Sequence, residues 1–281
     1  MTNIGVRIEQ RSEPTVATLA GLWSRSLIDW PDGRSDRTTF VNWMQGPSYY
    51  LDLRQPAGRP DYRGVRNLRG LNFEQLGWLA SQEGFAGELH YADGFFEWRR
   101  EIDFQPQAIY SDQGRLWMEP DMMVEEGKDI PYIEHWHREP VDLDPVCALR
   151  LDDPATGTRA YLMRLGALFM YARARSAAAA AGLHLQDCVA GAASLEEAQD
   201  LVDCEISQGV VSSAGWIVQR SSLPFREGER IDPVWDSKAS GAIVLSDVDA
   251  QGRDVSRRWQ ILDAQGALDA FPIEGKVRSA S

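Results

Sequence analysis

The residues of this sequence that best suit chemistry are charged side chains set among aromatic ones. In DGFFEWRREIDFQP, residues 93–106, large apolar side chains alternate with charged ones after an Asp-Gly turn. Successive side chains on a strand point to opposite faces, so Arg100 shares a face with the apolar residues. A guanidinium buried without a partner is very costly, so we expect Arg100 to contact a carboxylate or an anionic ligand. The inward face is predicted to hold Phe96, Trp98, Arg100, Ile102 and Phe104.

Two acids in other strand-like segments are the expected partners of Arg100. Glu134 lies between Tyr132 and Trp136, whose rings would desolvate it and raise its pKa, whereas a nearby arginine would lower that pKa. Two interpretations stay open. Arg100 closes a structural salt-bridge network, or it binds an anion beside Glu134 acting as a general acid or base.

The second acid, Asp52, lies in YYLDLR, residues 49–54, where both faces of the strand carry large side chains. If the purely apolar face points into the barrel, Asp52 points outwards. If that face packs against a second unit of the protein, Tyr50, Asp52 and Arg54 line a cavity instead. The alternation does not choose between these two arrangements.

The composition excludes several classes of function. The chain has 281 residues, 43% of them hydrophobic, and a net charge of −13, which would repel a nucleic acid backbone. No apolar run long enough to span a membrane and no signal peptide is found, and three scattered cysteines suit a reducing cytoplasm. We therefore expect a cytoplasmic protein without nucleic acid or membrane partners, and a homodimer stays open.

Known cofactor and metal patterns are not found. The sequence has no nucleophile elbow and no glycine-rich phosphate loop. His135 and His137 lie on one strand face, for which His90 and Glu139 are the candidate third ligands, but that face is opposite to the one carrying Glu134. We therefore predict no metal and no cofactor.

Short strands between turns dominate the remaining pattern. Asp93-Gly94 suits a two-residue hairpin, and Asp112 to Gly114 also resembles a turn. Helix starts are predicted at Asn72 and at Ser194, and the alanine-rich residues 174–185 are compatible with a short helix or a flexible connection. Many antiparallel strands with few helices predict a mainly β fold.

An internal repeat divides the chain into two units. YYLDLR (49–54) matches LFMYAR (168–173), and GFFEWRR (94–100) matches GWIVQR (215–220), which aligns Arg100 with Arg220. Similar features in one order at a spacing of roughly 120 residues indicate a duplicated unit. The boundary is expected in REPVDLDP, so the predicted domains are residues 1–140, carrying the candidate pocket, and residues 141–281.

Three motifs carry a resemblance to a known family. They are WMQGPSYYLDLRQP (43–56), EWRREIDFQP (97–106) and YIEHWHREPVD (132–142). The chain resembles a fungal and bacterial family whose fungal member is a partner of a casein-kinase-type protein kinase. The resemblance implies two lipocalin-like antiparallel β-barrels in tandem, each with a short helix, and implies no settled activity. The matched positions include Asp52, Arg54, Trp98, Arg100, Tyr132, Glu134 and Trp136.

Three functions are compatible with these features. The favoured one is a cofactor-independent lyase, isomerase or hydratase acting on a hydrophobic, aromatic small molecule in a barrel cavity, with Glu134, Arg100 and Asp52 as catalytic residues. The alternatives are a non-catalytic carrier or sensor, and a double barrel that binds a protein partner and has a filled interior. The expected ligand-binding residues are Tyr50, Arg54, Phe96, Trp98, Tyr132 and Trp136.

Overall fold

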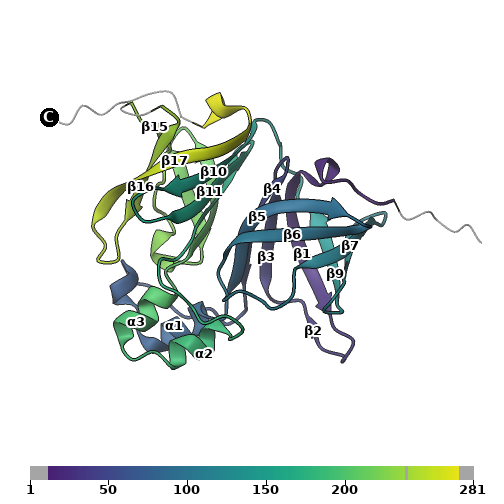
Figure 1. Ribbon diagram of the computed structural model, residues 1–281, viewed down its shortest axis with the longest axis horizontal. Helices are drawn as coiled ribbons and strands as arrows, with labels where there is room; N and C mark the ends of the chain where they lie inside the picture. The colour runs from purple at the N-terminus through teal and green to yellow at the C-terminus, as the bar shows by residue number, and fades with distance from the viewer. Residues whose placement is uncertain (1–11, 238–239, 272–281) are drawn as a thin grey trace, which may run out of the picture.

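The first half of the chain forms a closed antiparallel barrel, which we call the barrel. The structure is a computed structural model that describes residues 12–237 and 240–271. Within these residues eight strands close the barrel because β1 pairs with both β3 and β9, while β2 pairs with the end of β1 (Figure 1). The strands are β1 (Gly21–Asp29), β2 (Ser35–Asp36), β3 (Phe40–Gln45), β4 (Tyr49–Gln55), β5 (Glu83–Ala92), β6 (Phe95–Asp103), β7 (Gln113–Met118), β8 (Met123–Gly127) and β9 (Ile133–Arg138).

The second half forms an open, rolled sheet, which we call the second sheet. Its end strands β14 and β15 do not pair with each other in the described chain, so it is a half-barrel. An irregular segment spans the gap: Ile231 N–H donates to Trp216 O at 3.1 Å, and Ser246 N–H donates to Ile231 O at 3.2 Å. The strands are β10 (Val146–Asp153), β11 (Thr158–Leu165), β12 (Leu168–Arg173), β13 (Glu205–Ser212), β14 (Gly215–Ser221), β15 (Val234–Trp235), β16 (Ala242–Val248) and β17 (Asp254–Gly266).

The predicted mainly β fold with two antiparallel units is confirmed, and the turn predictions are confirmed in part. Asp93 and Gly94 have φ of +54° and +81° and join β5 to β6 as predicted. Asp112 to Gly114 is not a turn, because Gln113 already begins β7. The chain passes from the barrel to the second sheet through residues 139–145.

Short helices from both halves gather below the second sheet (Figure 1). The predicted capping box is present at the start of α1: Asn72 accepts from Gln75 N–H, and the Gln75 side chain accepts from Asn72 N–H. Ser194 accepts from Glu197 N–H at the start of α3. Residues 174–184 contain no helix, so this segment is a connection. The helices are α1 (Phe73–Leu79), α2 (Leu185–Ala190), α3 (Leu195–Leu201) and the single-turn η1 (Ala17–Leu19), η2 (Leu68–Gly70), η3 (Pro224–Arg226) and η4 (Leu268–Ala270).

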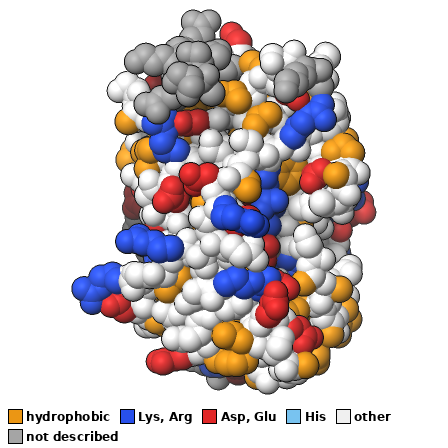
Figure 2. Space-filling model, turned by 90° about the vertical axis from the view of Figure 1, so that its left-hand side faces the viewer, with side chains coloured by type: hydrophobic (Ala, Val, Ile, Leu, Met, Phe, Trp, Pro, Cys, Tyr) orange, Lys and Arg blue, Asp and Glu red, His pale blue; other side chains and the backbone are white. Residues whose placement is uncertain are grey.

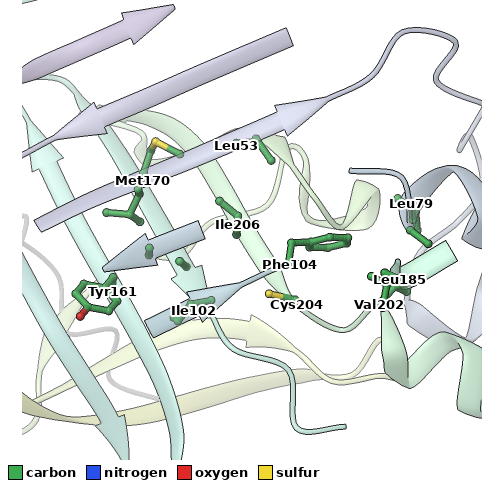
Figure 3. Packing of buried hydrophobic residues seen from close by; sticks show 14 of the residues in the cluster. Leu53, Leu79, Ile102, Phe104, Tyr161, Met170, Leu185, Val202, Cys204 and Ile206 are labelled. Atoms are coloured by element: carbon green, nitrogen blue, oxygen red, sulfur yellow. The ribbon is translucent and has the colours of Figure 1, made fainter. Parts of the chain in front are cut away.

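The barrel and the second sheet share one hydrophobic core. Leu53 and Phe104, from β4 and the end of β6, lie among Met170, Cys204 and Ile206 of the second half (Figure 3). These side chains are buried almost completely. Each unit therefore depends on the other for the burial of its outer apolar face.

Strand pairing supports the internal repeat through two matching β-bulges. The pairing of β5 with β6 shifts at Gly87, and that of β13 with β14 shifts at Gly209. A Cβ on Gly87 would lie 1.9 Å from the carbonyl oxygen of Arg99, and one on Gly209 would lie 2.1 Å from that of Ile217. Each bulge thus brings two backbones too close for any side chain.

The alignment of Arg100 with Arg220 is wrong. Arg100 lies opposite Gly87, and the residue opposite Gly209 is Val218. The β13–β14 hairpin is shorter than its counterpart, which moves the equivalence by two residues. Arg220 instead lies outside the second sheet's core, with its guanidinium 3.8 Å from the ring centroid of Phe40.

Surface charge is mixed on the face formed by the second sheet and the helices. Figure 2 shows acidic and basic side chains next to one another there, so the net charge of −13 is not gathered on that face. Among the described residues, no helix has both the length and the apolar character that crossing a membrane requires.

The two bulge glycines give a prediction about stability. We expect Gly87→Ala to lower the free energy of unfolding by about 1–3 kcal/mol, because the new methyl group meets rigid backbone. Gly77→Ala in α1 is the matched control: its Cβ meets nothing within 4 Å, so helix propensity should leave the protein equally stable or about 1 kcal/mol more stable. Urea unfolding measures both, and an unaltered midpoint for Gly87→Ala would contradict this role.

Candidate active site

The charged face of β4 points into the barrel. Tyr49, Leu51 and Leu53 pack in the core shared with the second sheet, which turns the other face inwards. Asp52 is 1% exposed, and Tyr50 is fully buried. The second of the two predicted arrangements is therefore correct.

Asp52 and Arg54 form a two-pronged ion pair inside the barrel. Arg54 Nε donates to Asp52 Oδ1 at 2.9 Å, and Arg54 Nη2 donates to Asp52 Oδ2 at 3.3 Å. The guanidinium also lies 4.8 Å from the ring centroid of Phe85 and 5.8 Å from that of Trp136. Burial raises the pKa of Asp52 to about 6, and Arg54 opposes that rise.

Glu134 is bound by two arginines, neither of which is Arg100. Arg25, from β1, donates to Glu134 Oε1, and Arg54 Nη1 lies 3.5 Å from the same oxygen. Glu134 is 1% exposed. Its charge is therefore compensated inside the barrel, and the predicted pairing of Glu134 with Arg100 is wrong. β1 supplies the missed partner Arg25.

Arg100 lies at the mouth of the barrel and binds two acids that were not predicted as its partners. Its Nη1 donates to Asp103 at 2.9 Å, and its Nη2 donates to Asp112 at 2.5 Å. The guanidinium lies 3.7 Å from the ring centroid of Phe85, and the side chain is 28% exposed. The predicted burial is thus partial, and the predicted pairing with Asp52 is wrong.

The β6 bulge explains the different partners. The extra residue, Glu101, interrupts the alternation, so Phe96 and Trp98 face the barrel interior whereas Ile102 and Phe104 face the second sheet. The prediction that all five positions share one side therefore holds through Arg100, which lies against Phe85 of the barrel interior, and is wrong for Ile102 and Phe104. The same shift places Asp103 opposite Phe85 on the barrel side.

A buried acid on β8, Glu125, is the most important site residue that was not predicted. Tyr132 Oη donates to Glu125 Oε1 at 2.7 Å, and Trp136 Nε1 donates to Oε2 at 3.0 Å. Burial, and then the charges of Glu134 and Asp112, raise the pKa of Glu125 well above its ordinary value. Its hydrogen-bond partners Tyr132 and Trp136 are neutral, so neither supplies a counter-charge to the ionised carboxylate.

Tyr132 reaches Glu125 because the intervening backbone carries no side chain. A Cβ on Gly127 would lie 2.5 Å from Cε1 of Tyr132. Burial and the adjacent Glu125 raise the pKa of the Tyr132 phenol well above its usual range, so the phenol is a proton donor rather than a base. The alternation of Met123 and Glu125 on β8 was the sequence signal that could have indicated this site.

Two spaces adjoin these groups. The inner cavity has a volume of about 10 Å³, which suits one water molecule and not an aromatic ligand. It is lined by Trp43, Asp52, Arg54, Phe85, Trp98, Asp112, Glu125 and Trp136. The predicted ligand-sized cavity inside the barrel is therefore not present, because tryptophans and ion pairs fill it.

The larger space is an outer cleft of about 680 Å³ at the mouth of the barrel. Arg100, Asp112 and Tyr132 line it, together with residues 105–111 and the start of the connection after β12. Trp98 and Asp112 line both spaces, so the outer cleft lies directly over the inner cavity. Of the nine predicted site residues, Arg100, Trp98 and Tyr132 contact the outer cleft, and the others lie deeper.

The described residues contain no group of three His, Cys, Asp or Glu side chains arranged to hold a metal ion. His137 Nε2 lies 2.9 Å from Ser26 Oγ, and His90 Nε2 lies 2.9 Å from Glu88. These histidines make surface contacts on separate strands.

The second sheet shows the same frame without the acids. Strand pairing aligns Asp52 with Tyr171 and Arg54 with Arg173. It also aligns Glu125 with Ile243 and Glu134 with Trp259. Buried ion pairs do occur in that half, between Arg226, Glu205 and Asp247, but at other positions. The acids of the barrel interior therefore have no counterparts at the equivalent positions of the second sheet, which has buried ion pairs elsewhere.

The contrast between two facing acids can be tested by replacing each with its neutral isostere. Glu134→Gln should cost roughly 3–5 kcal/mol, because it leaves Arg25 and Arg54 without a full counter-charge. Glu125→Gln should cost little below pH 4.5 and should become stabilising relative to wild type as the pH rises, because the raised pKa of Glu125 makes its ionisation favour the unfolded chain. Equal losses for both variants in urea unfolding would contradict the assignment.

The raised pKa of Glu125 fixes the direction in which the free energy of unfolding changes with pH. A raised pKa means that the folded protein holds the Glu125 proton more tightly than the unfolded chain does. This stabilisation is complete below the ordinary value of 4.5 and is lost as the pH rises through the raised value. The stability advantage of wild type over Glu125→Gln should therefore shrink from acidic to neutral pH.

Comparison with known proteins yields a single type of match. No family model matches the chain, and no curated protein matches it. A solved structure with similarity is the crystal structure of an uncharacterized protein, YLR301w, from Saccharomyces cerevisiae. It aligns with a TM-score of 0.47 at 9% sequence identity, over 87% of this chain and 98% of the yeast chain.

Proposed function

We propose that the protein is a cofactor-independent acid–base enzyme, of the lyase or isomerase type, acting on a small organic molecule in the outer cleft. The observation that carries this proposal is the position of Tyr132. This phenol lines the outer cleft and hydrogen-bonds to the buried Glu125, whose raised pKa favours the protonated form. A ligand in the cleft is thereby connected to a proton reservoir that is shielded from water.

The roles follow from which groups reach the cleft. When a ligand occupies the cleft, the Tyr132 hydroxyl turns its hydrogen from Glu125 toward the ligand, donates that proton and receives the proton of Glu125. Asp112, which also lines the cleft, accepts a proton from another ligand atom, and Arg100 positions it. One proton leaves the ligand and one is delivered, which is the balance of an isomerisation or of an elimination that protonates its leaving group.

Glu134 and Asp52 act behind these groups. Both lie deeper in the barrel and are paired with Arg25 or Arg54. The charge of Glu134 contributes to the raised pKa of Glu125. We therefore assign these two acids to tuning the proton donor rather than to touching the ligand.

The second sheet supports a functional origin for the buried charges. Its equivalent positions hold Tyr171, Ile243 and Trp259, so the same frame folds without an acidic cluster there. Buried ion pairs generally contribute less stability than well-packed apolar residues of similar volume. Retaining five carboxyls around three arginines in the barrel is thus a cost that catalysis would justify.

A second candidate function is binding of a protein partner, as the resemblance to a kinase-interacting family implies. Ile109, Tyr110 and Ile130 beside the outer cleft are 83%, 61% and 55% exposed, which gives a partner an apolar contact. Free Cys147, Cys188 and Cys204 are consistent with the cytoplasm as the location of either function.

Deuterium exchange tests the enzyme proposal and does not require that the substrate be identified first. The protein is incubated in deuterium oxide with pooled small metabolites, and mass spectrometry detects compounds that gain a carbon-bound deuteron. Wild type should label at least one compound, and Tyr132→Phe should slow labelling by about 100-fold or more, because it removes the donor. Asp112→Asn should do the same.

The matched control is Tyr91→Phe. This exposed tyrosine of β5 does not line the cleft, and its hydroxyl donates to Glu13, so labelling should be unchanged. Labelling that survives Tyr132→Phe in a folded protein would exclude the proposed proton donor. Absence of labelling by wild type would favour the binding function.

A further inference from the structure

The outer cleft contains an arginine whose charge is not paired with an acid. Arg175, on the connection that follows β12, donates from Nη1 to Leu201 O at 3.0 Å and from Nη2 to Asp103 O at 3.1 Å and to Phe104 O. All three acceptors are backbone carbonyls. Among the described residues, no carboxylate lies within ion-pairing distance of Arg175. Three of the five N–H donors are engaged, which leaves two for a ligand.

The other charged groups of the cleft are already paired. Arg99 binds Glu97 at 2.8 Å, and Arg100 binds both Asp103 and Asp112. Glu101 is bound by Arg150 at 2.6 Å. Asp129, at the rim, is exposed, where water and salt screen its charge. Arg175 is therefore the cation that offers a ligand an uncompensated charge.

The backbone carbonyls hold the Arg175 guanidinium in place. Leu201 is the last residue of α3, whereas Asp103 and Phe104 lie at the end of β6. The side chain thus connects both halves of the molecule and is partly buried between them. A planar guanidinium fixed in this way needs little further ordering to bind a carboxylate.

An apolar surface continues from this cation along the cleft. The exposed side chains of Ile109, Tyr110 and Ile130 line it together with Ala177 and Ala179. Residues of this kind bind hydrocarbon or aromatic groups. The cleft therefore combines one fixed positive charge with an extended apolar wall.

We infer that the ligand of the outer cleft is an amphipathic organic acid whose carboxylate binds Arg175 and whose apolar body lies on Ile109, Tyr110 and Ile130. This assignment deepens the proposed function, because it names the substrate class for the same cleft. Binding does not require turnover, so it can be tested separately from Tyr132. It replaces Arg100, which is saturated by two acids, as the anion-binding residue.

Two probe molecules that share a naphthalene ring distinguish the contribution of the charge to binding from that of the apolar contact. Calorimetric titration compares naphthoate with naphthylmethanol, which differ in carrying a carboxylate or a neutral hydroxyl group. Wild type should bind naphthoate about tenfold more tightly than naphthylmethanol, since a charge-assisted hydrogen bond to a partly exposed arginine is of that strength. Arg175→Gln should remove this preference and leave naphthylmethanol binding unchanged.

Two further variants keep the test decisive. Arg175→Lys retains the charge and should retain much of the preference, which a purely structural role would not explain. Arg99→Gln removes a cleft arginine that is already paired and should leave the preference intact. Thermal melting of each variant shows that it is folded.

The inference is overturned if Arg175→Gln keeps the preference, if Arg99→Gln loses it equally, or if wild type does not bind naphthoate at millimolar concentration. Its failure is distinguishable from failure of the proposed enzyme. If Tyr132→Phe stops deuterium labelling while Arg175→Gln still binds naphthoate preferentially, the enzyme proposal is supported and the proposed ligand class is wrong. The reverse pattern identifies an acid-binding protein without the proposed chemistry.

Discussion

The site depends on an imbalance of charge inside the barrel. Five carboxyls, of Asp52, Asp103, Asp112, Glu125 and Glu134, lie around the guanidinium groups of Arg25, Arg54 and Arg100. The arginines bind four of these acids, and Glu125 receives only the neutral donors of Tyr132 and Trp136. Burial without a counter-charge raises the pKa of Glu125, because ionisation would place a second negative charge beside Glu134. The same low-polarity interior that makes the ion pairs strong thus creates a proton donor at its edge.

The sequence predicted which side chains face the barrel interior better than it predicted which side chains pair with one another. Period-two alternation identified an interior arginine, an interior glutamate and the flanking tryptophans, and each lies inside the barrel or at its mouth. It failed at Glu101, where a bulge inserts one residue and reverses the faces of everything that follows. Gly87, opposite the bulge, was a visible signal, but a single glycine in a strand has several explanations. Partner identity could not be predicted, because Arg25 and Glu134 are 109 residues apart and meet only through closure of the barrel.

Comparing equivalent positions of the two halves shows which residues the shared fold requires and which are particular to the candidate site. Both halves keep the bulge glycine, the following tryptophan and an arginine on the strand after the first hairpin, as Gly87 and Gly209 illustrate. The glycines mark close approach of two backbones, and the tryptophans pack in the interior of each half. The interior acids are not kept, since Ile243 and Trp259 stand where Glu125 and Glu134 do. Acids at these particular positions are therefore not required for the frame, although the second half has buried ion pairs of its own between Arg226, Glu205 and Asp247.

The two halves also make the outer cleft jointly. β6 and β7 supply one wall, and the connection after β12 supplies Arg175, which is held against the barrel by the carbonyls of Asp103 and Phe104. The shared core beneath, with Phe104 packed among Cys204 and Ile206, fixes the relative position of those elements (Figure 3). A barrel separated from the second sheet would retain the proton donor but lose the cation that orients a ligand toward it. In the proposed function, the second half of the chain thus contributes Arg175 to the site, where it would bind the carboxylate end of the ligand.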